Sequence, residues 1–174
     1  MTQILYMENI EGNYIKEFEA TVIKSKKDYI CLDKTAFYPE GGGQPSDVGY
    51  IEWDNNQSEI TQVIKKGDTI KHIIKGEKPP VGTKIKANIN WERRYGHMKM
   101  HTAQHILSGI IFDDYKARTV GNQIHADYSR VDFHPAHFSQ EDLVKIEKKF
   151  NEIVSKKLSI KIYKEERESL KKRA

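Results

Sequence analysis

The chain has 174 residues, of which 37% are hydrophobic and 31% are charged, and its formal net charge is +4. This composition fits a soluble globular protein, and no apolar run approaches the roughly 18 residues that span a bilayer. The N-terminus lacks the basic start and apolar stretch of a secretory signal, and the single cysteine, Cys31, excludes an internal disulfide. We therefore expect a cytoplasmic protein without a membrane partner.

Positive charge is concentrated at the C-terminal end. Residues 156–174 contain eight Lys or Arg and three Glu, a net of +5, which exceeds the +4 of the whole chain. A uniformly basic nucleic-acid-binding surface is therefore not indicated, whereas a basic end that touches a phosphate backbone is. A solvated helix face explains the same charges equally well.

From Tyr14 to about Asn90 the pattern favours short strands. Apolar and polar residues alternate in EFEATVIKS and again around Tyr29 and Cys31. The segments GYIEWD, EITQVIKKG, TIKHIIKG and KIKANINW repeat this behaviour between Asn-Asn, Lys-Gly, Pro-Pro and Val-Gly turns. About six short strands with such turns predict a small β-barrel over residues 1–90.

The period of the pattern changes at Trp91. Residues 91–115 predict one long helix, and residues 117–134 predict a strand pair that turns near Asp127 to Ser129. Ser139 and Asp142 have capping-box spacing at the start of a second helix, and a strand over 159–165 and a helix over 166–174 are expected after it. The predicted fold class is α+β, with the barrel followed by an α+β layer over residues 91–174.

Three histidines lie along one stripe of the first predicted helix. Residues 97–105 read HMKMHTAQH, so His97, His101 and His105 stand four apart. Two imidazoles one turn apart can hold a divalent ion, but Thr102 replaces the Glu that follows the first histidine in HExxH metalloproteases, so peptide hydrolysis by that route is not supported. Structural histidines remain the alternative. Zinc would need a further ligand, for which Cys31, His125, His134 and His137 are candidates, each more readily explained as structural.

The segment YPEGGGQPSDVG, residues 38–49, contains three consecutive glycines. A phosphate cradle, a tight barrel corner and a close approach to a site elsewhere each explain them. No Lys-Ser/Thr follows the glycines as a P-loop requires, and a barrel strand rather than a βα unit precedes them, so a phosphate-binding nucleotide enzyme is disfavoured.

Taken in order, the segments FYPEGGGQPSD, HMKMHTAQHILSG and ARTVGNQIHADYSRVDF resemble the free-standing alanyl-tRNA editing proteins, the AlaX family. They are also similar to the editing domain of alanyl-tRNA synthetase and, more distantly, to that of threonyl-tRNA synthetase. The resemblance runs from about residue 14 to the end of the chain. It implies a barrel like those of translation factors, followed by a two-layer α+β editing core, here a partial one. It also implies hydrolysis of the ester between a wrong amino acid, chiefly serine and sometimes glycine, and the 3′ end of tRNA for alanine.

The resemblance also implies roles for individual residues. A zinc ion would be held by the two histidines of HxxxH and by a Cys and a His from a later CxxxH motif. The threonine after the HxxxH helix would contact the serine hydroxyl, and Gln123 lies near a glutamine linked to editing, with Asn122 as the alternative one residue away. The expected site therefore comprises catalytic Gln44 and Gln123, substrate-binding Thr119, Gly41, Gly42 and Gly43, and metal-binding His101 and His105.

The CxxxH motif is not among these 174 residues, so the sequence holds half of the ligand set that the family uses for zinc. The editing core is therefore expected to be truncated, to be completed by another chain, or to use an unorthodox third ligand such as His125. No tightly bound zinc is expected in this chain alone. An unfinished sheet also predicts self-association through its exposed edge.

Two functions of different class stay open. One is an aminoacyl-tRNA deacylase, or the N-terminal part of one, and the other is a non-catalytic tRNA-binding module of the same fold without metal. In both, basic and aromatic side chains would contact the tRNA acceptor end. The candidates, each of which also has a purely structural explanation, are Arg93, Arg94, Lys99, Arg118, Tyr95, Tyr115 and Phe133.

Overall fold

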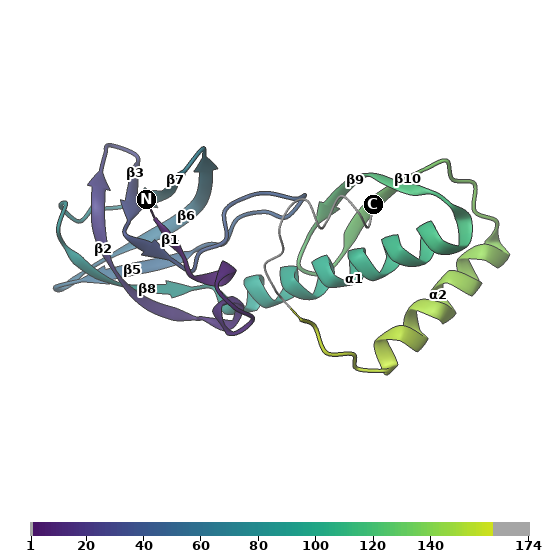
Figure 1. The fold of residues 1–174 in the computed structure, drawn as a ribbon. Helices are drawn as coiled ribbons and strands as arrows, with labels where there is room; N and C mark the ends of the chain where they lie inside the picture. The colour runs from purple at the N-terminus through teal and green to yellow at the C-terminus, as the bar shows by residue number, and fades with distance from the viewer. Residues whose placement is uncertain (1, 162–174) are drawn as a thin grey trace, which may run out of the picture.

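A closed six-stranded barrel lies at one end of the molecule, and a long helix leads from it to an α+β layer (Figure 1). The structure is a computed structural model that describes residues 2–161. The α+β class and the N-terminal barrel predicted from the sequence are confirmed. Around the barrel the strand order is β2 (Glu17–Ser25), β3 (Tyr29–Leu32), β7 (Thr69–Lys75), β6 (Asn56–Lys66), β5 (Gly49–Trp53) and β8 (Lys84–Ile89).

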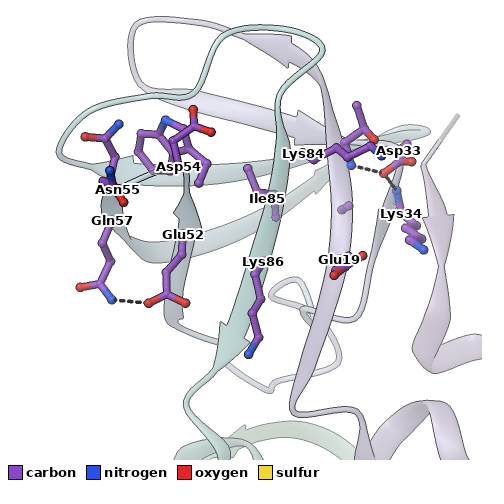
Figure 2. Close-up of a pocket in the computed structure, with 14 residues that line it drawn as sticks. Glu19, Asp33, Lys34, Glu52, Asp54, Asn55, Gln57, Lys84, Ile85 and Lys86 are labelled. Atoms are coloured by element: carbon purple, nitrogen blue, oxygen red, sulfur yellow. Dashed lines mark hydrogen bonds between the residues drawn. The ribbon is translucent and has the colours of Figure 1, made fainter.

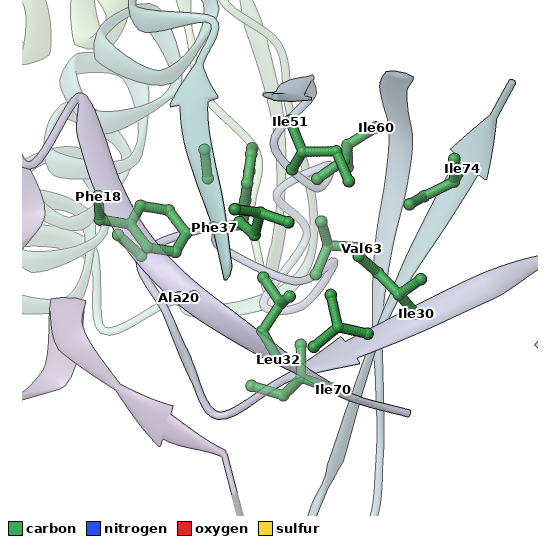
Figure 3. Packing of buried hydrophobic residues seen from close by; sticks show 14 of the residues in the cluster. Phe18, Ala20, Ile30, Leu32, Phe37, Ile51, Ile60, Val63, Ile70 and Ile74 are labelled. Atoms are coloured by element: carbon green, nitrogen blue, oxygen red, sulfur yellow. The ribbon is translucent and has the colours of Figure 1, made fainter. Parts of the chain in front are cut away.

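The strands close because each has one apolar face directed into the barrel. In β2, for example, Phe18, Ala20 and Val22 are buried while the residues between them are more exposed. Isoleucine and leucine side chains from the other strands fill the same interior (Figure 3). Phe37, from the segment after β4 (Lys34–Thr35), is fully buried among them, with its ring 5.7 Å from that of Phe18. The loop that leaves the barrel after β4 is thus anchored by an apolar side chain.

The short N-terminal elements were not predicted. Strand β1 (Gln3–Ile4) pairs in parallel with β4, and two 3₁₀ turns, η1 (Leu5–Met7) and η2 (Glu11–Tyr14), connect it to β2. Elements of two to four residues are too short for a hydrophobic period to reveal them.

Helix α1 (Trp91–Tyr115) has the bounds that the sequence predicted. Asn90 caps its N-terminus, because the side-chain oxygen accepts a hydrogen bond from the Arg93 amide at 3.1 Å. The helix ends where Lys116 adopts a left-handed conformation, with φ of 57°.

The predicted strand pair and second helix are also present. Strands β9 (Arg118–Ile124) and β10 (Ser129–His134) are antiparallel, and α2 (Gln140–Ser155) begins with the predicted capping box between Ser139 and Asp142. The two helices and the strand pair share a second core, which contains Ile110, Ile111, Ala117 and Ile146.

The remaining predictions for the C-terminal end fall largely outside the described residues. Within the strand expected over 159–165, residues 159–161 have no regular structure, and the rest of that strand and the helix over 166–174 lie outside. The boundary proposed near residue 90 falls between β8 and α1, and a division into two domains there stays a prediction. None of the helices within residues 2–161 combines the length and apolar character needed to cross a membrane.

Candidate active site

The three glycines form a tight turn at the tip of the loop between β4 and β5. The amide of Gly41 donates to the carbonyl of Gln44 at 3.1 Å, and the amide of Gln44 donates back at 3.0 Å. Between them, Gly42 and Gly43 have φ angles of 61° and 78°, as a two-residue type I′ turn requires. Glycine adopts these angles without strain, which explains why the turn consists of glycines.

This turn is docked on strand β9 of the second layer. The amide of Ile124 donates to the carbonyl of Gly43 at 2.9 Å, and Nδ2 of Asn122 donates to the carbonyl of Gly42 at 3.1 Å. A Cβ atom on Gly43 would lie 2.1 Å from Oδ1 of Asn122, so only glycine allows this approach. Figure 1 shows the loop reaching from the barrel toward β9. Of the explanations considered for the glycines, the structure displays two, the tight turn and the close approach to a second layer.

A buried ion pair anchors the other end of the loop to α1. The Arg94 and Asp47 side chains are 2% and 0% exposed, and Nε of Arg94 donates to both carboxylate oxygens at 2.9 and 2.8 Å. Arg94 also donates to the backbone carbonyls of Asn13 and Ala36. The expectation that Arg94 contacts tRNA is therefore wrong, because its guanidinium is fully used inside the protein.

Of the three histidines, His101 contacts the glycine-rich loop, and His105 stacks on His101. The rings of His101 and His105 are nearly parallel, with centroids 5.0 Å apart and an angle of 12° between their planes. Nδ1 of His101 lies 2.8 Å from Oε1 of Gln44, whose side chain is buried. An amide oxygen only accepts, so Nδ1 carries the proton and the Nε2 lone pair of His101 is left free. Burial, and secondarily His105, lowers the pKa of His101, which favours this neutral form.

The other candidate ligands, His97, His125 and Cys31, have no contact with His101 or His105 among those described above. His97 is buried, and its pKa is lowered by burial and by the charge of Arg93. The ring of His125, the candidate third ligand, stacks on Tyr128 with centroids 4.3 Å apart. Cys31 is buried in the barrel strand β3.

The donor set for a metal ion can be tested on this geometry. His101 and His105 present two imidazoles on one helix face, the spacing that suits one tetrahedral ion. The hydrogen bond from Nδ1 of His101 to Gln44 fixes the orientation of the first ring. Within residues 2–161, no group of three His, Cys, Asp or Glu side chains is arranged to hold a metal ion. The described residues thus fit two of the four positions.

Strand β9 presents Thr119 and Asn122 to α1. Oγ1 of Thr119 lies 2.7 Å from Oγ of Ser108, and Nδ2 of Asn122 lies 3.5 Å from Oε1 of Gln104. Side chains three residues apart on a regular strand would point to opposite faces, but the register shifts at Val120, so both reach the helix.

Gln123 alternates with Asn122 along β9 and is exposed on the other face of the strand. The structure therefore brings Gln44, the glycine turn, the two histidines and Thr119 to one side of the layer, together with Asn122, and it leaves Gln123 facing away.

Several polar residues of this region were not singled out from the sequence. Gln104 and Ser108 on α1 and Asp47 in the loop are buried or half-buried. Their partners are distant in the sequence, so no spacing rule marks them. The one signal was the place of Asp47 within the glycine-rich segment.

The barrel also has a separate cavity, which none of these residues lines. It has a volume of about 860 Å³ and lies over β2, β5 and β8 (Figure 2). Exposed or half-buried side chains of both charges line it, including Glu19, Glu52, Lys84 and Lys86. It contains none of the residues predicted for the active site, so we do not assign the chemistry to it.

Comparison with known proteins gives a consistent result. The sequence family described as tRNA synthetases class II (A) matches residues 3–93. The chain is 42% identical over 172 residues to the alanyl-tRNA editing protein AlaX-M of Methanosarcina mazei, covering 94% of this chain and 67% of the relative. It is 33% identical over 166 residues to AlaX-M of Saccharolobus solfataricus, covering 94% and 68%. It is also 38% identical over 159 residues to the alanine–tRNA ligase of Thermococcus kodakarensis, covering 88% of this chain and 17% of the ligase.

The barrel, the HxxxH helix and these matches define a protein related to the class II tRNA synthetases. Within that class, the chain belongs to the AlaX family of alanyl-tRNA editing proteins. It spans about two thirds of the length of its AlaX-M relatives.

Proposed function

We propose that the chain acts as a trans-editing hydrolase, which cleaves the ester between serine or glycine and the 3′ end of tRNA for alanine. The observation that carries the proposal is the hydrogen bond between Gln44 and His101, 2.8 Å long. It joins the glycine turn of the barrel to the HxxxH helix, next to a strand that presents Thr119. Membership of the AlaX family supports the same activity.

His101 and His105 would hold a zinc ion, with Gln44 keeping the tautomer of His101 that leaves Nε2 free. When bound, zinc supplies Lewis acidity that polarises an ester carbonyl. The glycine turn contributes backbone without side chains, so an aminoacyl group has room to approach. Gln44 is proposed as a catalytic residue on the strength of the resemblance. Gln123 was expected beside it but faces away from the site, so Asn122, the alternative one residue away, is proposed in its place.

Thr119 would distinguish serine from alanine. Its side chain is exposed near the start of β9, so its hydroxyl is available to a ligand. A serine hydroxyl can hydrogen-bond with it, whereas alanine would leave it without a partner once the site is closed to water.

The exposed start of α1 would contact the tRNA. Tyr95 is 42% exposed, its ring stacks on Trp91 at 5.6 Å, and Nζ of Lys99 lies 5.1 Å from the Tyr95 ring centroid. Aromatic rings beside lysines suit single-stranded RNA such as the acceptor end. Tyr115 and Phe133 are less suitable, since both pack in the second core.

Serine release from seryl-tRNA for alanine, measured with added zinc, tests the proposal. We expect zinc-dependent release by the unaltered chain, and loss of both zinc binding and release in His101→Ala. Gln140→Ala removes an exposed side chain at the start of α2, outside the site, and is the control. Binding of the tRNA without release would instead support the alternative, a tRNA-binding module without catalysis.

A further inference from the structure

A hydrogen-bonded row of four polar side chains lies between α1 and β9 and ends at Thr119. Nδ2 of Asn122 lies 3.5 Å from Oε1 of Gln104, and Nε2 of Gln104 lies 2.9 Å from Oγ of Ser108. Oγ of Ser108 in turn lies 2.7 Å from Oγ1 of Thr119. Gln104 is 6% exposed and Thr119 is exposed, so the row of side chains extends from the interior to the surface that faces the ligand.

The glycine turn fixes the direction of the hydrogen bonds at the buried end. The Gly42 carbonyl can only accept, so the Asn122 atom 3.1 Å from it is the amide nitrogen. That same nitrogen approaches the side-chain amide of Gln104, which must therefore present its oxygen there. The Gln104 nitrogen then faces Ser108 and donates to it.

Ser108 accepts from Gln104, and within the described residues its hydroxyl has one other side-chain partner, which is Thr119. Either hydroxyl can be the donor in this pair, because a hydroxyl oxygen can accept two hydrogen bonds. When Ser108 donates to Oγ1 of Thr119, the Thr119 hydrogen is free to point toward a ligand; when Thr119 donates to Ser108, its oxygen is presented instead.

We propose that Gln104 and Ser108 are positioning residues that hold the Thr119 hydroxyl as a hydrogen-bond donor, so that the site selects an amino acid whose side chain accepts a hydrogen bond. This inference rests on the proposed editing function and adds the polarity of its recognition group. A ligand side chain without an acceptor leaves the Thr119 donor unpaired, which weakens its binding.

Amide-linked, non-hydrolysable aminoacyl adenosines test the polarity by calorimetry on the full chain. The O-methylseryl and norvalyl side chains have the same shape, but only the first contains an oxygen atom. That ether oxygen can accept a hydrogen bond and cannot donate one. We expect the unaltered chain to bind the O-methylseryl compound about five- to tenfold more tightly, the effect of one neutral hydrogen bond. A site that presents an acceptor would prefer the norvalyl compound.

Gln104→Glu reverses the direction of these hydrogen bonds. A carboxylate accepts from Ser108, so Ser108 no longer donates to Thr119, and the Thr119 hydroxyl donates to Ser108 instead. At about pH 8, where a carboxyl group is normally ionised, we expect the preference for O-methylseryl to vanish while the norvalyl affinity is unchanged. A merely structural defect would weaken both compounds alike. Gln140→Glu adds the same charge at the exposed start of α2 and should keep the preference. If Gln104→Glu does not fold, Ser108→Ala, which removes the donor to Thr119, should reduce the preference as well.

The seryl and alanyl compounds distinguish a failure of the proposed editing function from a failure of the inferred donor role of Thr119. If the unaltered chain binds the seryl compound no better than the alanyl one, the proposed function fails, and this inference with it. If serine is preferred but norvalyl binds as tightly as O-methylseryl, or if neither variant changes the preference, the inference fails and the function stands.

Discussion

At the scale of single residues, Gly43 makes the closest approach between the barrel loop and the second layer. A Cβ atom there would lie 2.1 Å from Oδ1 and 2.9 Å from the carbonyl oxygen of Asn122, and φ is 78°. At Gly41 nothing lies within 4 Å of the same position. We expect Gly43→Ala to lower the free energy of unfolding by about 2 kcal/mol, and Gly41→Ala to lower it much less, in urea denaturation. Equal losses would mean that the docking of the turn adds nothing to stability.

His72, inside the barrel, makes stability depend on pH. It is fully buried, hydrogen-bonded to Thr35 at 2.9 Å, and burial lowers its pKa from 6.5 to about 4. Between these values the unfolded chain binds the proton and the folded chain does not, so stability is retained above about pH 6.5 and falls as the pH drops toward 4.

At about pH 5 the loss is about 2 kcal/mol, at roughly 1.4 kcal/mol per pH unit. Urea denaturation of the unaltered chain and of His72→Gln at pH values from about 7.5 to 5 measures it. The difference in unfolding free energy between the two should shift by this amount in favour of the variant as the pH falls. A constant difference would show that His72 does not titrate as its burial requires.

At the scale of elements, the Asp47–Arg94 pair connects the loop to helix α1. Both side chains are buried, so removing one charge leaves the other without compensation. We expect Asp47→Ala to lower the free energy of unfolding by about 3–5 kcal/mol. Glu17→Ala breaks the exposed pair with Lys86 and should change stability little. Similar effects of the two substitutions in thermal denaturation would contradict this account.

The elements that the sequence reveals are those with a period. The barrel strands alternate, α1 repeats at helical spacing, and Ser139 with Asp142 marks the start of α2, so these were predicted with nearly correct bounds. Within α1, however, the buried residues before Ile110 are mostly polar, namely Arg94, His97 and Gln104, with Gly96 among them. Their burial depends on partners in the glycine loop and β9, which no local pattern encodes.

The same limit applies to the candidate site. Resemblance and spacing identified His101, His105, Gln44 and Thr119, and the structure brings their elements together. The bulge at Val120, which turns Asn122 and not Gln123 toward the helix, depends on the pairing register with β10 and had no signature in the sequence. The chain of hydrogen bonds behind Thr119 was hidden for the same reason.

At the scale of the whole molecule, the second layer exposes apolar surface. Leu143 and Val144 on α2 are 46% and 59% exposed, and a groove of about 320 Å³ lies between α1, α2 and β10. Within residues 2–161, no strand pairs with the outer edge of β10. We therefore predict that two copies of the chain associate through this face. Sedimentation should show a dimer whose formation is weakened by Leu143→Lys, whereas a monomer at high concentration would contradict the prediction.

The central claim is that this fold edits mischarged tRNA, and the most direct test is discrimination between two substrates. Seryl-tRNA and alanyl-tRNA, both made on the tRNA for alanine, are incubated with the chain and zinc, and release of each amino acid is followed over time. The account predicts that serine is released well above the uncatalysed rate, and at least tenfold faster than alanine, the order of magnitude for one recognised hydroxyl group. Release of both amino acids at the uncatalysed rate, or at the same catalysed rate, would contradict it.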